Sequence, residues 1–177
     1  AKPSPYQFRQ QWMQTADDDV EAQLLTFSLR PVDEIRAVAG RHAEAPQLRL
    51  GQKTLADDMV TLVHGAAAAT AANEAADLLF SKDPTGASEV AFETLAGEIP
   101  HSRMRASELD DTVGVLVATD LAQSNGDARR TLAQHAVYAN GVQLGEKDQI
   151  SDQKLLHGRY LLLRKGKKSH HLVEIDR

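Results

Sequence analysis

The chain has 177 residues, of which 42% are hydrophobic and 25% charged, an ordinary composition for one large globular domain or two small ones. Aromatic residues make up only 5%, so aliphatic and alanine-rich helix packing must supply most of the core. The absence of cysteine excludes disulfides and thiolate metal sites and fits a reducing compartment, so we expect a cytoplasmic protein. No apolar run approaches the roughly 20 residues that cross a bilayer, and the N-terminal residues lack a signal-peptide pattern. We therefore predict no membrane partner.

Charge is divided unevenly along the chain, whose net charge is −5. Residues 1–122 contain 10 Lys and Arg against 19 Asp and Glu, a net charge of −9, whereas residues 123–177 contain 10 against 6, a net charge of +4. Such asymmetry indicates a nucleic-acid-binding module attached to an acidic body. The basic module is the C-terminal one.

The first half of the chain is predicted to be helical. Apolar spacing and alanine content place five helices at about residues 4–12, 20–27, 31–40, 47–64 and 66–80. Ser4 can cap the first of them with Pro5 at its first position, and Phe8 and Trp12 then share one face. Gly65 separates the last two helices. We assign residues 1–82 to a helical bundle.

Residues 83–106 are predicted to be a linker that can hold one short helix. Val90, Phe92 and Leu95 allow that helix, whereas Pro100 to Arg105 has the composition of a loop. Apolar periodicity resumes from Leu109 to Leu121, so the second domain is assigned to residues 107–177.

A second helix of that domain is predicted to begin after Ser124. Ser124 can cap it, and Asp127 in its first turn suits the free backbone N–H groups there. Ala128 and Leu132 share one side at i, i+4 spacing, which leaves Arg129 and Arg130 facing solvent.

Two hairpins are predicted to follow this helix. Their strands are placed at residues 136–139, 142–144, 159–164 and 170–175, with Asn140-Gly141 as a tight turn and Lys165 to Lys168 as a basic turn. The predicted fold class is therefore mainly α plus a small α+β domain, in which two helices pack on a small antiparallel sheet with cations at one rim.

These residues resemble the small RNA-binding fold named for ribosomal small-subunit protein four, hereafter the S-four-like domain. The residues that carry the resemblance are Ser124, Ala128, Arg129, Arg130, Asn140, Gly141, Gly158, Arg159 and Tyr160. His135 stands where that family often has Gly, so a different local backbone is expected there.

The N-terminal part resembles the helical region downstream of the catalytic domain in bacterial tyrosyl-tRNA synthetases, a family that continues into an S-four-like domain. The matching residues are Ser4-Pro5-Tyr6, Phe8, Trp12, Asp17 to Val20, Phe27-Ser28, Glu34-Ile35, Gln52-Lys53, Leu55-Ala56, Val63 to Gly65 and Leu79-Phe80. The His-Ile-Gly-His and Lys-Met-Ser-Lys-Ser type motifs of class I synthetases occur nowhere in the sequence. The resemblance thus implies a non-catalytic C-terminal part of a tyrosine–tRNA ligase, with no cofactor in this chain and ATP in the catalytic domain.

In that family the two domains hold tRNA(Tyr) by its anticodon end and its long variable arm. The resemblance implies an RNA-binding set made of Arg129, Arg130, Asn140, Arg159, Arg164, Lys165, Lys167 and Lys168, whose cations neutralise phosphates. Asp17 aligns with the family position that reads the first anticodon base; a helix cap is its alternative role. The implied partners are tRNA(Tyr) and the catalytic domain of the same enzyme. The resemblance implies that the whole enzyme is a homodimer whose interface lies chiefly in the catalytic domain. A monomeric fragment is compatible with that interface.

Other functions have weaker support in the residues. His157, His170 and His171 lack the helical His-x-x-x-His spacing of a zinc site, so no metal is predicted. Lys165 to Lys168 lacks the Gly and the Ser or Thr that a phosphate-binding loop requires. The competing class is a free-standing S-four-like RNA-binding protein, for instance one attached to ribosomes, with the helical part as a partner-binding arm. A purely structural helical interaction domain is the third class, and it predicts no RNA affinity at low salt.

Overall fold

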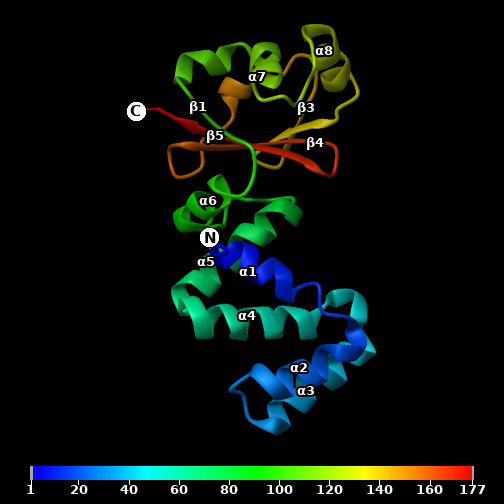
Figure 1. Cartoon of the computed structure of the whole chain (residues 1–177). Helices are drawn as coiled ribbons and strands as arrows, with labels where there is room; N and C mark the ends of the chain where they lie inside the picture. Colours follow the sequence, from blue (N-terminus) through cyan, green and yellow to red (C-terminus); the bar gives the residue numbers. More distant parts are fainter. Residues whose placement is uncertain (1, 177) are drawn as a thin grey trace. The chain divides into compact units, whose positions relative to one another are not determined.

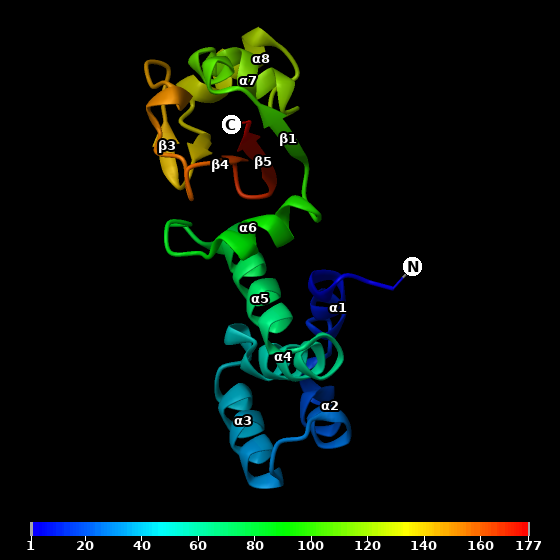
Figure 2. The same ribbon diagram turned by 90° about the vertical axis from the view of Figure 1, so that its left-hand side faces the viewer.

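The computed structural model describes residues 2–176, which divide into two compact units at Ala76/Asp77. Unit 1 is helical, and unit 2 contains helices and a sheet (Figure 1; Figure 2). The division falls within α5 (Ala66–Phe80), a single helix that matches the predicted fifth helix. Each unit has its own hydrophobic core.

Unit 1 contains the predicted helices with small differences at their ends. Its elements before α5 are α1 (Pro5–Trp12), η1 (Asp17–Asp19), α2 (Val20–Phe27), α3 (Val32–Glu44), η2 (Pro46–Leu48) and α4 (Leu50–His64). Ser4 caps α1 through a capping box with Gln7, as the Ser-Pro pattern predicted. Helix α3 continues past Gly40, where we expected its end, because the added turn buries His42 against the backbone of Gly51.

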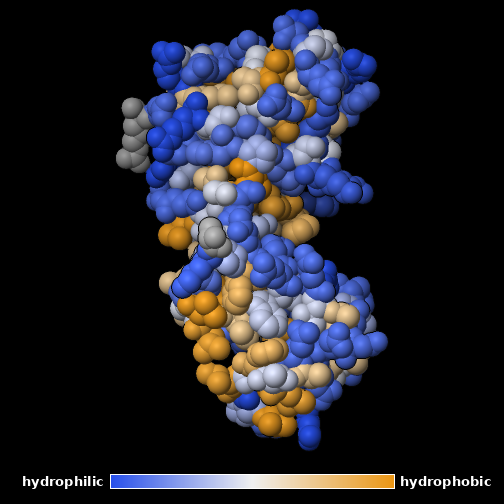
Figure 3. Space-filling view, in the orientation of Figure 1, coloured by the Kyte–Doolittle hydropathy of each residue, from blue (hydrophilic) through white to orange (hydrophobic). Residues whose placement is uncertain are grey.

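The core of unit 1 is aliphatic, with two aromatic side chains of α1 at its edge. Val20, Leu24, Ile35, Val38, Leu55 and Met59 are buried, and Phe8 and Trp12 pack against them. Unit 1 nevertheless has apolar side chains on its surface (Figure 3). Its exposed large hydrophobic residues include Leu25, Phe27, Leu29, Val32, Leu62 and Val63. Unit 1 thus has a complete small core and additional apolar surface.

Unit 2 is built on a five-stranded sheet of order β1-β5-β4-β2-β3. Its strands are β1 (His101–Met104), β2 (Val137–Ala139), β3 (Val142–Leu144), β4 (Tyr160–Lys165) and β5 (Ser169–Ile175). Its remaining elements are α6 (Glu89–Ala96), η3 (Ala106–Asp110), α7 (Thr112–Ala118), α8 (Asn125–Ala133) and η4 (Ile150–Asp152). The two predicted hairpins are confirmed, and α7 and α8 lie together on one face of the sheet (Figure 1).

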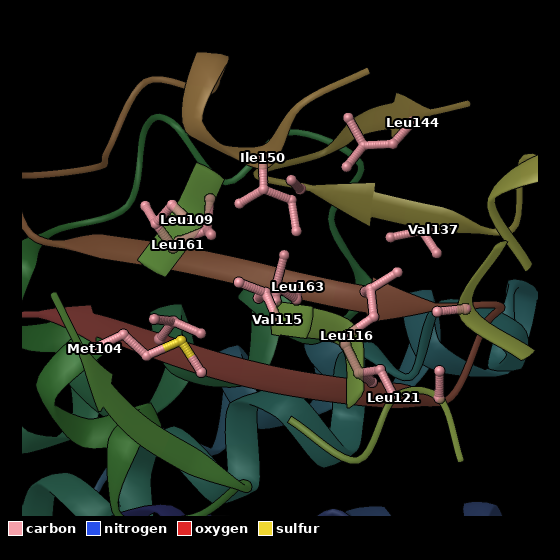
Figure 4. Packing of buried hydrophobic residues seen from close by; sticks show 14 of the residues in the cluster. Met104, Leu109, Val115, Leu116, Leu121, Val137, Leu144, Ile150, Leu161 and Leu163 are labelled. Carbon is pink, nitrogen blue, oxygen red and sulfur yellow. The ribbon is translucent and has the colours of Figure 1, made fainter. Parts of the chain in front are cut away.

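Alternate residues of each strand bury one face of the sheet against α7 and α8. The cluster includes Val115 and Leu116 of α7 and Leu161 and Leu163 of β4 (Figure 4). The intervening residues point to the opposite face, where Tyr160 stacks on Phe92 of α6 with ring centroids 5.2 Å apart. The sheet therefore has helices on both faces, with α6 on the side away from α7 and α8 (Figure 2).

Two expectations for this region were wrong. The predicted linker at residues 83–106 does contain a short helix, α6, but His101–Met104 forms strand β1 and the whole segment belongs to unit 2. The sheet is mixed rather than antiparallel, because β1 pairs in parallel with β5. The sequence pattern did not predict this strand because it contains polar residues such as His101 and Arg103. Their side chains lie 3.2 and 3.4 Å from the carboxylate of Glu174 on β5 instead of entering a core.

Candidate nucleic-acid interface

The turn between β4 and β5 presents a cluster of cations. Lys167 and Lys168 are exposed, and Lys165 is half-buried at the end of β4. Gly166 has a φ of +61°, a left-handed conformation that favours glycine, and its N–H donates to the carbonyl of Ala136 at 2.9 Å. The turn is therefore fixed to the sheet while its lysine side chains remain free to contact an anion.

Helix α8 adds a second pair of cations. The side chain of Ser124 accepts a hydrogen bond from the N–H of Asp127 at 3.1 Å, so the predicted cap is confirmed. Ala128 is fully buried, which orients α8 on the sheet, and Arg129 and Arg130 are exposed as predicted.

An ion pair brings the start of α8 to the end of β4. Lys165 Nζ lies 3.5 Å from Asp127 Oδ2. A hydrogen bond from the N–H of Gln123, with further contributions from Lys165 and Arg130, lowers the pKa of Asp127 below its usual value. Lys165, Lys167 and Lys168 also line one surface cavity of about 530 Å³ together with Gln123 and the exposed Asp120. We call the cations of α8 and of the β4–β5 turn the basic rim: Arg129, Arg130, Lys165, Lys167 and Lys168.

Arg164 lies on the other face of the sheet. Its guanidinium carbon is 4.0 Å from the centre of the Tyr138 ring on the neighbouring strand β2. The same guanidinium donates to the carbonyl of Gly166 at 2.8 Å. Arg164 is thus a stacked cation at the base of the turn rather than a free one.

Arg159, which was predicted to contact RNA, lies apart from the basic rim. It precedes β4, at the end opposite to Lys165, and pairs with Glu174 at 2.5 Å and with Glu89 at 3.1 Å. Hydrogen bonding to Glu174 raises the pKa of Arg159, and the same contact lowers the pKa of Glu174. These partners neutralise the arginine, and Glu89 ties α6 to the sheet through it.

Asn140 is also placed differently from the expectation. It is 7% exposed, its amide nitrogen donates to the carbonyl of Lys154 at 2.8 Å, and its amide oxygen accepts from the N–H of Leu162 at 2.8 Å. Both polar ends are therefore committed inside unit 2. Asn140 thus holds the hairpin turn in shape, and a contact between its side chain and RNA stays a prediction.

Asp17 of unit 1 belongs to a separate polar site. Gln52 Nε2 donates to Asp17 Oδ1 at 2.7 Å, and His42 Nε2 lies 3.0 Å from the same oxygen. Gln52 and His42 are buried, whereas the side chain of Asp17 is 58% exposed at a cavity of about 390 Å³ that Arg49 also lines. The bond from Gln52 is the main cause that lowers the pKa of Asp17, so the carboxylate is ionised at neutral pH.

Asp17 does not cap a helix in the structure, so its alternative predicted role is wrong. No side-chain hydrogen bond caps η1, which Asp17 begins, or α2, which follows it. Sequence reasoning missed the supports Gln52 and His42, although Gln52 lies within the Gln-Lys pair of the resemblance. Because burial positions these two side chains, their contacts with Asp17 could not be derived from the local pattern.

The histidines do not assemble a metal site within residues 2–176. No group of three or more His, Cys, Asp or Glu side chains among these residues could hold a metal ion. The ring of His157 is 2.8 Å from the carbonyl of Ala87, and that of His171 is 2.7 Å from the hydroxyl of Ser102. Over the same residues, no helix is long and apolar enough to cross a membrane.

Comparison with known proteins places both units in one family. The family model described as tyrosine–tRNA ligase SYY-like C-terminal domain matches residues 91–173. A tyrosine–tRNA ligase of Anaeromyxobacter dehalogenans (strain 2CP-1) is 38% identical over 99% of this chain. The chain matches the C-terminal part of tyrosine–tRNA ligases.

The tyrosine–tRNA ligases of Streptomyces avermitilis and Salmonella paratyphi B are 34% and 37% identical, each over 97% of the chain. The chain spans 43% of the length of the Anaeromyxobacter ligase and 41% of each of the other two. The alignments therefore include unit 1 as well as unit 2.

Proposed function

We propose that this chain is the tRNA(Tyr)-binding, non-catalytic portion of a tyrosine–tRNA ligase. Unit 2 would hold the RNA backbone with the basic rim, and unit 1 would contact the anticodon at Asp17. The observation that carries the proposal is the basic rim, in which the β4–β5 turn and the start of α8, separate in sequence, are joined by the Lys165–Asp127 pair. Support also comes from relatives named as tyrosine–tRNA ligases.

The basic rim suits phosphates because its lysines and arginines have few competing anions. Asp127 contacts Lys165 Nζ and also accepts a hydrogen bond from the backbone N–H of Gln123, and Asp120 lines the same cavity as the three lysines. Arg129, Arg130, Lys167 and Lys168 all remain exposed. Such contacts give an affinity that depends on salt and little on sequence, because releasing counterions from the RNA drives binding.

Asp17 is suited to read a base edge. A carboxylate accepts hydrogen bonds from the N–H groups of a base, and the contacts with Gln52 and His42 occupy one oxygen, leaving the other at the cavity. Because buried residues hold the carboxylate in place, its direction is set before binding. Identity would then come from unit 1 and affinity largely from unit 2.

The remaining partners follow from the same proposal. ATP and tyrosine would be bound by a catalytic domain of the same enzyme, outside this chain, and the parent would be a homodimer in the cytoplasm. The free-standing RNA-binding protein is less well supported, because the alignments to ligases cover 97–99% of the chain and are not confined to unit 2.

The experiment is a salt titration of binding to a tRNA(Tyr) transcript, measured by fluorescence anisotropy. The double variant Arg129→Ala/Lys167→Ala should bind more weakly and lose about 1.5 from the slope of log K against log salt, since each phosphate contact contributes about 0.7–0.9. The far-UV spectrum should be unchanged. Arg105→Ala/Lys154→Ala, which removes two exposed cations outside the basic rim, is the matched control. Equal affinity and slope in the rim variant and the parent would refute the assignment.

A further inference from the structure

A second cavity of unit 2 lies on the sheet face that carries Arg164, opposite α7 and α8. Its volume is about 660 Å³, and the residues around it include Phe80, Lys82, Tyr138, Gly141, Arg164 and Lys167. That volume falls in the range of about 300–1,000 Å³ that is typical of small-ligand sites. The basic rim does not account for this cavity, since Lys167 is the one rim residue that lines it.

One wall of the cavity is a flat stack of an aromatic ring and a guanidinium. Tyr138 points away from the core because its neighbours Val137 and Ala139 are buried on the other face. Arg164 covers its ring at 4.0 Å and is held there by the carbonyl of Gly166. The Tyr138 hydroxyl receives a hydrogen bond from Gln143 at 3.1 Å, so the ring is fixed as well.

The other wall is the end of α5 and the segment after it. Phe80, the last residue of α5, is 85% exposed and lines the cavity. The carbonyl of Lys82 packs so closely on Gly141 that a Cβ there would lie 2.1 Å from it, and Pro84 is buried beside the same glycine. This wall is therefore anchored on the Asn140-Gly141 turn, while a large aromatic side chain stays open to solvent.

The charge of the cavity identifies the occupant that fits. Lys82, Arg164 and Lys167 are its cations, and no Asp or Glu stands among the described residues that line it. Aromatic rings and arginine planes are the surfaces on which proteins stack unpaired bases, while the adjacent lysines contact the backbone. Lys167 lines both this cavity and the one at the basic rim, so a strand that follows the turn passes both.

We propose that this cavity binds one unpaired base of the RNA, stacked between Phe80 and the Tyr138–Arg164 pair. The inference rests on the proposed RNA binding by the basic rim and adds a site that distinguishes unpaired from paired RNA. A base within a duplex cannot enter the cavity, because both of its faces are already stacked.

The test compares two RNA probes on the whole chain: a single-stranded oligonucleotide and a fully paired duplex of the same length, at one salt concentration. Phe80→Leu removes a ring that is 85% exposed, so the fold should be unaffected. We expect it to weaken binding of the single strand by about 5- to 150-fold, the range for loss of one base–aromatic stack, and to leave duplex binding and both salt slopes unchanged. Tyr138→Leu should act in the same direction.

Phe27→Leu is the matched control, since it makes the same change at an exposed aromatic residue of unit 1 that lines a different cavity. Unchanged single-strand affinity in Phe80→Leu and Tyr138→Leu would overturn the base site and leave the proposed function standing. An equal loss for the duplex would also overturn it. If the parent chain binds neither probe, the proposed function fails, and the base site fails with it.

Discussion

Replacing Asn140 tests whether this residue stabilises the fold or contacts RNA. In Asn140→Ala, the N–H of Leu162 and the carbonyl of Lys154 lose their partners in a nearly buried position. Each such loss costs about 1–3 kcal/mol. Asn140 also has a φ of +47°, and alanine in this left-handed region costs about 1–2 kcal/mol more than in a right-handed one. The expected loss is therefore about 3–8 kcal/mol, a large share of the roughly 5–15 kcal/mol that holds a domain folded.

The assay is urea unfolding followed by two signals. Far-UV circular dichroism reports both units, whereas tryptophan fluorescence reports unit 1, because Trp12 is the only tryptophan in the chain. Asn140→Ala should lower the midpoint of the unit 2 transition and leave the fluorescence transition in place. Asn140→Gly keeps the backbone conformation without strain, so it should lose about 1 kcal/mol less.

The control for this prediction is Asn125→Ala, which changes an exposed asparagine of α8. Its free energy of unfolding should stay within about 0.5 kcal/mol of the parent. A loss of less than about 1 kcal/mol in Asn140→Ala would refute the structural role. So would a reduced RNA affinity in a variant whose stability is unchanged, because that result would make Asn140 a contact residue.

Three further predictions concern the ionised groups outside the basic rim. Asp17→Asn should weaken discrimination at the first anticodon base of a tRNA(Tyr) transcript, which competition with transcripts mutated at that base would measure; equal discrimination would refute the site. Folding lowers the pKa of Asp17, so its ionised carboxylate should stabilise the folded state at pH values above its ordinary pKa of 3.8. This stabilisation should be lost as the pH falls through the lower pKa of the folded state. The free energies of unfolding of the parent and of Asp17→Asn, compared over an acid titration, would measure it. Arg159→Met should lower the thermal unfolding midpoint of unit 2, because Glu174 and Glu89 lose their partner. The salt slope of RNA binding should stay unchanged in this variant; a smaller slope would show that Arg159 contacts a phosphate.

The elements predicted from periodicity and turn residues were placed well. Ser4, Ser124 and the Asn-Gly turn act through neighbours in the sequence, so the local pattern contains their structural role. The strand at His101–Met104 could not be found in this way. Its pairing partner is more than sixty residues away, and its polar side chains bind Glu174 rather than fill a core.

The same distinction applies to the candidate site. Exposure of Arg129, Arg130, Lys167 and Lys168 follows from helix and turn geometry, and these residues are where the sequence predicted them. The neutralisation of Arg159 depends on Glu89 of α6, which pattern reasoning assigned to a linker. Tyr138 could have been found, because strand alternation between the apolar residues Val137 and Ala139 places its ring on the other face.

The pairing of β1 with β5 has a consequence for how the protein is made on the ribosome. Strand β5 lies inside the sheet, between β1 and β4, and it follows every other strand of unit 2 in the sequence. During synthesis β1 therefore cannot pair with β5 until all the intervening residues have been translated. Unit 1 precedes every strand of the sheet in the sequence, so it can finish folding in that interval, before the sheet of unit 2 is complete.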